Sequence, residues 1–139
     1  MPADLTRFIE AQERDYATAL REIRAGRKQS HWMWYIFPQL AGLGFSETSR
    51  YYALADLAEA KAFLEHELLG PRLVRICEAL LALPARDATA IFGTPDDMKL
   101  RSCMTLFARV PGAPPVFEAV LESFFGGRAD ERTIRLLGE

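Results

Sequence analysis

The apolar residues of this 139-residue chain recur at the spacing of an α-helix, and Gly or Pro interrupts the pattern at short intervals. The clearest segment, residues 4–25, carries its apolar side chains on one helical face, with Gln12 as the one polar residue there. No segment shows the sustained alternation between hairpin turns that is typical of a β-sheet. The sequence therefore predicts an all-α protein.

Capping signals place the other helix boundaries. Thr94 and Pro95 supply an N-cap hydroxyl and a first-turn proline just after Gly93, so one helix is expected to end at Gly93 and another to begin there and run to about residue 109. Similar signals stand at Asp56, before Pro71 and at Asp130. The remaining expected helices cover residues 56–70, 71–81, 87–92, 115–125 and 130–137.

The length suits one domain, because a chain of this size buries about two-thirds of its unfolded surface around a single core. There is no repeat, low-complexity segment or linker. We expect a single compact multihelical domain of six or seven helices over residues 1–139.

Charge and motifs exclude several classes of function. A net charge of −2 gives no general attraction for nucleic acid or an anionic membrane. The N-terminal segment has no apolar core of a signal peptide, so we expect a cytoplasmic protein without membrane contact. Cys77 and Cys103 lack metal-ligand spacing and are expected to be buried reduced thiols. No dinucleotide, phosphate-loop, zinc or serine-triad motif is present, so we expect no metal and no cofactor. Nothing in the sequence sets the oligomeric state.

The segment GRKQSHWMWYIFPQLAGLGFS, residues 26–46, fits neither helical nor strand periodicity over its length. One interpretation is that its aromatic side chains fill gaps between helices, with WMWYIF as a short buried strand. The other is a pocket that holds a planar ring, with Gly42 and Gly44 allowing a backbone to approach the ligand. Its candidate ligand-binding residues are Arg27, Lys28, His31, Trp32, Trp34, Phe37 and Gln39.

A second candidate is FGTPDDMKLRSCMTLF, residues 92–107, where polar and apolar residues interleave on one helix. A structural interpretation makes Asp97 and Arg101 an exposed ion pair, with acidic residues compensating the helix dipole. The functional interpretation places a carboxylate, Lys99 and Arg101 at a helix start whose free backbone amides favour phosphate, with Ser102 as a further candidate for ligand binding. We expect His31, Trp32 and Trp34 of the first segment to lie close to the turn from Asp97 to Arg101.

Four stretches together resemble an uncharacterised bacterial family, domain of unknown function 1810, which sometimes has a calpastatin-like label. They are AGRKQSHWMWYIFPQLAGLGFS, YYALADLAEAKAFLEHELLGPRL, IFGTPDDMKLRSCMTLFA and PVFEAVLESFFGG, and the resemblance covers about residues 5–137. It implies a small all-helical domain. It implies no activity, and no calpastatin inhibitor repeat is present.

The order of features is also distantly similar to the NADAR (YbiA-like) proteins, which are helical N-glycosidases acting on ADP-ribose-type and ribosyl-amine substrates. Residues 88–93 and 99–107 would occupy the places of two NADAR blocks. The tryptophan of the second block has no counterpart here, and the NADAR glutamate has no assigned position.

Three functions follow as hypotheses. The first is an enzyme that cleaves an N-glycosidic bond in a nucleotide-like molecule, where a carboxylate stabilises the cationic sugar. The second is a module that binds such a molecule without catalysis. The third is a protein-interaction domain with exposed aromatic residues. For the enzyme, the expected roles are stacking by Trp32 and Trp34, phosphate binding by Arg27, Lys28 and Arg101, charge stabilisation by Asp97 or Glu47, and proton donation or imine formation by Lys99.

Overall fold

The computed structural model of the chain describes residues 4–138, and the helical prediction is confirmed. The described residues form nine helices instead of six or seven, with no strand and one isolated parallel bridge between Leu40 and Leu54. The helices are α1 (Thr6–Arg24), α2 (Met33–Ile36), α3 (Glu47–Tyr51), α4 (Leu57–Glu65), α5 (Leu69–Leu81), α6 (Ala88–Phe92), α7 (Asp96–Ala108), α8 (Val116–Phe125) and α9 (Glu131–Leu136).

Of the two unexpected helices, α2 lies within residues 26–46, the segment without clear periodicity, and α3 directly follows it. Helix α2 has four residues and α3 has five, which is little more than one turn each. An apolar repeat cannot become visible over one turn, so this segment showed no helical pattern. The possible strand at WMWYIF is wrong, because most of that stretch forms α2.

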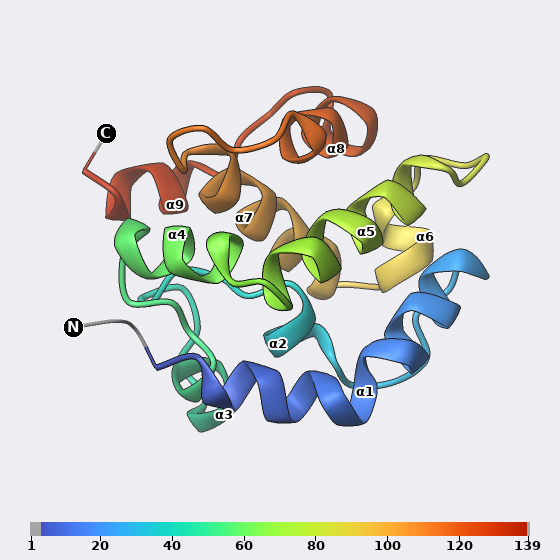
Figure 1. Cartoon of the computed structure of the whole chain (residues 1–139). Coiled ribbons are helices and arrows are strands. Elements are labelled where there is room, and N and C mark those ends of the chain that lie inside the picture. Colours follow the sequence, from blue (N-terminus) through green and yellow to red (C-terminus); the bar gives the residue numbers. More distant parts are fainter. Residues whose placement is uncertain (1–3, 139) are drawn as a thin grey trace.

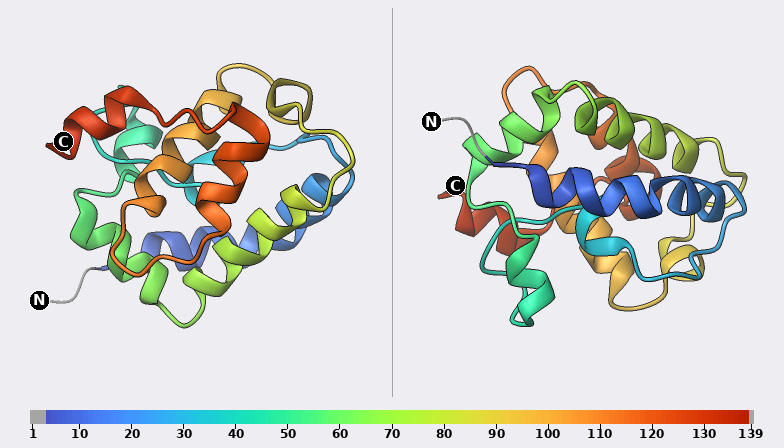
Figure 2. Two further views of the ribbon diagram at one scale, coloured as in Figure 1. Left: turned by 90° about the horizontal axis from the view of Figure 1, so that it is seen from above. Right: turned by 60° about the horizontal axis from the view of Figure 1, so that its bottom comes forward.

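The long helices pack around α5 and α7. Helix α5 contacts α1 on one side and α8 on the other, while α7 contacts α4, α6, α8 and α9 (Figures 1 and 2). The apolar face of α7 is fully buried at Leu100, Met104 and Phe107. Short α2 lies against α1 and brings the aromatic segment toward this core.

Local capping explains several of the helix boundaries. The carboxylates of Asp56, Asp87 and Asp130 each accept a hydrogen bond from a backbone N–H three residues later, at 2.9, 3.1 and 3.0 Å. Gly93 ends α6 with a φ of 74°, as its position after Phe92 predicts. The prediction that Thr94 is the N-cap of α7 is wrong, because the helix begins at Asp96 and Pro95 occupies the N-cap position.

Both cysteines are buried and reduced, as predicted, and burial raises the pKa of each thiol. None of the helices within residues 4–138 combines the length and the apolar composition that crossing a bilayer demands.

Candidate ligand-binding site

The aromatic segment divides between core and pocket. Trp32 is 1% exposed, and its indole Nε1 donates to Glu22 Oε1 at 2.9 Å. Phe37 is fully buried and packs edge-on against Phe92, with ring centroids 5.8 Å apart. Trp34 is only partly buried, since α2 turns Met33 and Tyr35 into the core and leaves Trp34 at a pocket wall. Trp32 and Phe37 thus fill the core between helices, whereas Trp34 lines a pocket.

Glu22 fastens the loop that precedes these aromatic residues. Its buried carboxylate accepts hydrogen bonds from the backbone N–H groups of Gln29 and Ser30, from the Ser30 hydroxyl and from Trp32, at 2.6–2.9 Å. Burial by itself raises the pKa of Glu22, but these bonds outweigh it and lower the pKa to about 2. The loop from α1 to α2 is therefore held by one ionised carboxylate.

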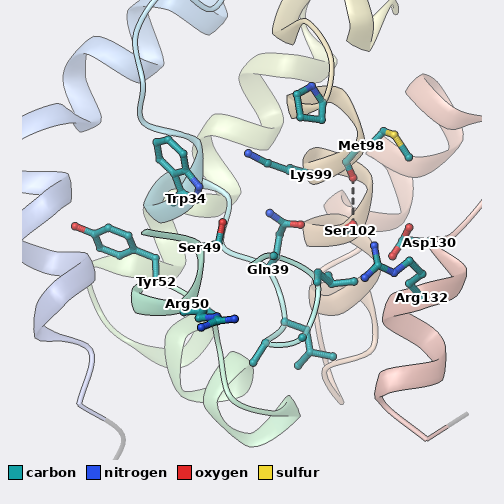
Figure 3. A pocket seen from close by; sticks show the side chains of 17 residues that line it. Trp34, Gln39, Ser49, Arg50, Tyr52, Met98, Lys99, Ser102, Asp130 and Arg132 are labelled. Carbon is teal, nitrogen blue, oxygen red and sulfur yellow. Dashed lines mark hydrogen bonds between the residues drawn. The ribbon is translucent and has the colours of Figure 1, made fainter. Parts of the chain in front are cut away.

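A pocket of about 380 Å³ lies beside α2, between residues 39–53, the first turns of α7 and the start of α9 (Figure 3). Three cationic side chains and one carboxylate, that of Asp130, line it. Polar groups from four parts of the chain therefore meet in one place. Besides Trp34 and Asp130, its main polar lining residues are Gln39, Ser49, Arg50, Lys99, Ser102 and Arg132.

Trp34 presents an unpaired donor at this pocket. Its Nε1 is buried and makes no hydrogen bond to the described residues, whereas the Trp32 indole is paired with Glu22. The ammonium of Lys99 lies 5.1 Å from the centroid of the Trp34 ring, and Figure 3 shows Lys99 extending from α7 toward it. A buried donor without a partner costs about 1–3 kcal/mol, and an acceptor that reached Nε1 from the pocket would remove this cost.

Asp96, the first residue of α7, joins the two sequence segments. Its Oδ1 lies 3.2 Å from Lys99 Nζ and its Oδ2 lies 2.9 Å from Lys28 Nζ. Lys28 is in turn 5.1 Å from the Trp32 ring centroid. The two segments therefore lie close together, as expected. Asp96 contacts Lys28, and Lys99 contacts Trp34.

Two glycines shape the loop at the opposite wall. A Cβ atom on Gly44 would lie 2.5 Å from Ser49 Cβ, so a larger residue would push the loop away from α3. Gly42 has a φ of 101°, a conformation that L side chains rarely adopt. Gly44 lets the loop approach α3 closely, whereas Gly42 lies against Leu136 of α9, and both line the pocket.

The other candidate residues lie outside the pocket lining. Arg27, His31 and Glu47 are exposed. Asp97 faces α6 and accepts a 2.7 Å hydrogen bond from the Thr89 hydroxyl. Arg101 donates to the carbonyls of Arg128 and Ala129 at 2.8 and 2.9 Å, which holds the connection between α8 and α9.

Sequence reasoning did not select several residues that line the pocket. Ser49, Arg50 and Tyr52 belong to or follow α3, whose single turn gave no signal, and Asp130 was visible only as a helix cap. Arg132, two residues further on, carried no signal of its own.

Comparison with known proteins gives a relative of similar structure. The crystal structure of the conserved hypothetical protein Rv1873 from Mycobacterium tuberculosis superimposes with a TM-score of 0.96, at 47% sequence identity, over 100% of this chain and 99% of that one. A search of curated proteins found no match. The model of the family described as protein of unknown function (DUF1810) matches residues 2–137, and the chain belongs to this family.

Proposed function

We propose that this protein binds a small molecule with an anionic group in the Trp34 pocket, and that nucleotides are the class to test first. The observation that carries the proposal is the buried Trp34 Nε1, which has no acceptor among residues 4–138, with the Lys99 ammonium 5.1 Å from the centroid of the same ring. A donor and a positive charge side by side suit a phosphate or carboxylate oxygen, because charge-assisted hydrogen bonds are the stronger ones.

The charge of the pocket supports the same class of ligand. Lys99, Arg50 and Arg132 outnumber the single lining carboxylate, Asp130, although the whole chain carries −2. The volume of about 380 Å³ falls within the range of small-molecule sites, about 300–1,000 Å³. Because Lys99 lies over the Trp34 ring, it covers the face on which a planar ligand would stack. The pair therefore suits an anion better than a stacked ring.

The ion pair between Lys99 and Asp96 favours a role for Lys99 in binding over a role in imine formation. Imine formation requires an uncharged amine, whereas Lys99 lies 3.2 Å from the Asp96 carboxylate as an ion pair. Binding of an anion uses the ammonium as it stands. We therefore assign Lys99 to ligand binding, together with Gln39 and Ser102 of the same lining.

The test is a thermal-shift comparison of AMP, ADP-ribose, inorganic phosphate and adenosine. A ligand at 100 times its Kd adds about 2.7 kcal/mol to the free energy of unfolding. We expect stabilisation by AMP and ADP-ribose but little by adenosine, which lacks the anionic group. Equal effects of AMP and adenosine would refute the anion site, and no effect of any probe would reject this ligand class.

Hydrolysis of an N-glycosidic bond is the second candidate, and Asp130 is the residue that favours it. Its carboxylate lines the pocket, and within residues 4–138 only its Oδ2 accepts hydrogen bonds, both from Thr133. A carboxylate there would stabilise the cationic sugar while water adds to the anomeric carbon and the base leaves with a proton. Asp97 and Glu47 do not line this pocket.

Asp130→Asn separates hydrolysis from binding alone. Because Asn is as good an N-cap as Asp, α9 and the melting temperature should be preserved. If hydrolysis occurs, we expect base release from ADP-ribosyl and ribosyl-amine substrates to fall at least about 100-fold in Asp130→Asn, as for loss of a transition-state charge partner. Asp97→Asn, outside the pocket, should retain wild-type turnover. If the wild-type protein binds these substrates but releases no base, hydrolysis is rejected and the binding function stands.

A further inference from the structure

We propose that Lys28 and Asp96 are positioning residues for Lys99. Together the three form a lysine array, Lys28–Asp96–Lys99, that holds the Lys99 ammonium over Trp34 and leaves one net positive charge at the pocket wall. The array is a property of the protein without ligand. Its effect on affinity rests on the proposed function, because that function supplies the anion.

Both oxygens of Asp96 are used in the array. One contacts Lys28 Nζ at 2.9 Å and the other contacts Lys99 Nζ at 3.2 Å. An acidic residue in the first turn of a helix is favoured by the helix dipole alone, but the dipole does not require a lysine on each oxygen. The carboxylate thus bridges the two lysines. The ion pair with Lys28 holds the carboxylate in place, and the carboxylate in turn holds the Lys99 ammonium.

Lys28 forms the rigid end of the array. Its side chain is 8% exposed, and its ammonium also donates to the carbonyl of Ser30 at 2.6 Å. The backbone N–H of Lys28 donates to the carbonyl of Ile91 at 2.8 Å, which ties it to α6. Lys99 is more exposed, at 23%, and lines the pocket, whereas Lys28 does not. Lys28 thus lies behind Asp96, away from any ligand in the pocket.

The array also acts on an anion in the pocket through its net charge. Two ammonium groups and one carboxylate leave a net charge of +1 beside Trp34. In Lys28→Met, Asp96 would neutralise Lys99 alone, so the field acting on an anion would weaken although Lys28 does not touch it. In Asp96→Asn, Lys99 would lose the partner that holds it over Trp34.

Lysine-selective NMR of the ligand-free protein tests the positioning. The chain has only three lysines, and Lys61, exposed on α4, is a built-in control. The side-chain CH₂ protons next to the ammonium of Lys28 and Lys99 lie near tryptophan faces, so ring currents should separate them from those of Lys61. Asp96→Asn should move the Lys99 signal toward that of Lys61. An unmoved Lys99 signal would overturn the array.

Affinity for AMP and adenosine tests the charge effect. Lys28→Met should weaken AMP binding roughly fivefold at low salt, with the difference shrinking as salt rises, because screening reduces the lost Coulomb attraction. Adenosine binding should not change, and Lys61→Met should affect neither probe. Unchanged AMP affinity in Lys28→Met would refute the charge effect. If the wild type binds no AMP, the proposed function fails, and the ligand-free NMR still decides whether Asp96 positions Lys99.

Discussion

Trp34→Phe is expected to weaken AMP binding about 10- to 100-fold, which corresponds to losing a hydrogen bond to a charged group worth about 1.5–3 kcal/mol. Phe keeps an aromatic ring near Lys99 but removes the indole N–H. The melting temperature should stay the same or rise slightly, because the wild-type Nε1 has no partner to lose among residues 4–138. Calorimetric titration and thermal unfolding measure the two quantities.

Trp32→Phe is the matched control, with the opposite expected result. Trp32 also has a lysine over its ring, but it is fully buried and its Nε1 donates to Glu22. Its replacement should lower stability by about 1–3 kcal/mol, from the lost hydrogen bond and the smaller ring, while AMP affinity stays near wild type. Reduced affinity in Trp32→Phe with unchanged affinity in Trp34→Phe would place the site elsewhere.

Glu22→Gln is expected to destabilise the protein by about 1–3 kcal/mol at neutral pH, because an amide offers only one acceptor oxygen to four donors. The folded pKa of Glu22 is about 2, below the ordinary value of 4.5, so ionised Glu22 stabilises the fold above pH 4.5. This contribution is lost as pH falls from about 4.5 to 2.

Denaturant unfolding of wild type and Glu22→Gln across this pH range measures the effect. The difference in the free energy of unfolding should narrow toward pH 2, since the other carboxylates are common to both proteins. A difference that stays constant from pH 7 to 2 would contradict an ionised Glu22 as the anchor of the loop.

Local sequence signals account for much of the fold. Asp56, Asp87 and Asp130 cap helices because a short carboxylate reaches the backbone N–H three residues on, a contact that needs no tertiary structure. The boundary at Thr94 was misplaced by one residue, which is the ordinary uncertainty at a helix end. Helix α2 could not be predicted, because the formation of such a short helix depends on packing, and α3, which has no buried residue, is too short to show an apolar repeat.

The site was less predictable than the helices. The sequence showed that aromatic and cationic residues are dense at residues 26–46, but composition cannot tell which of two tryptophans is buried. That choice depends on Glu22 pairing with Trp32, ten positions earlier in the chain. Arg50 and Arg132 meet at the pocket because α3, α7 and α9, which are far apart in the sequence, are brought around it by the fold.

The most direct test of the anion site follows the two indole N–H signals by NMR during titration with AMP. The chain has only two tryptophans, and Trp32 is already bonded to Glu22, so it serves as an internal reference. We predict that the Trp34 indole signal moves downfield as its N–H gains an acceptor, while the Trp32 signal stays in place. A titration in which AMP binds and the Trp34 indole signal does not move would contradict the proposed site.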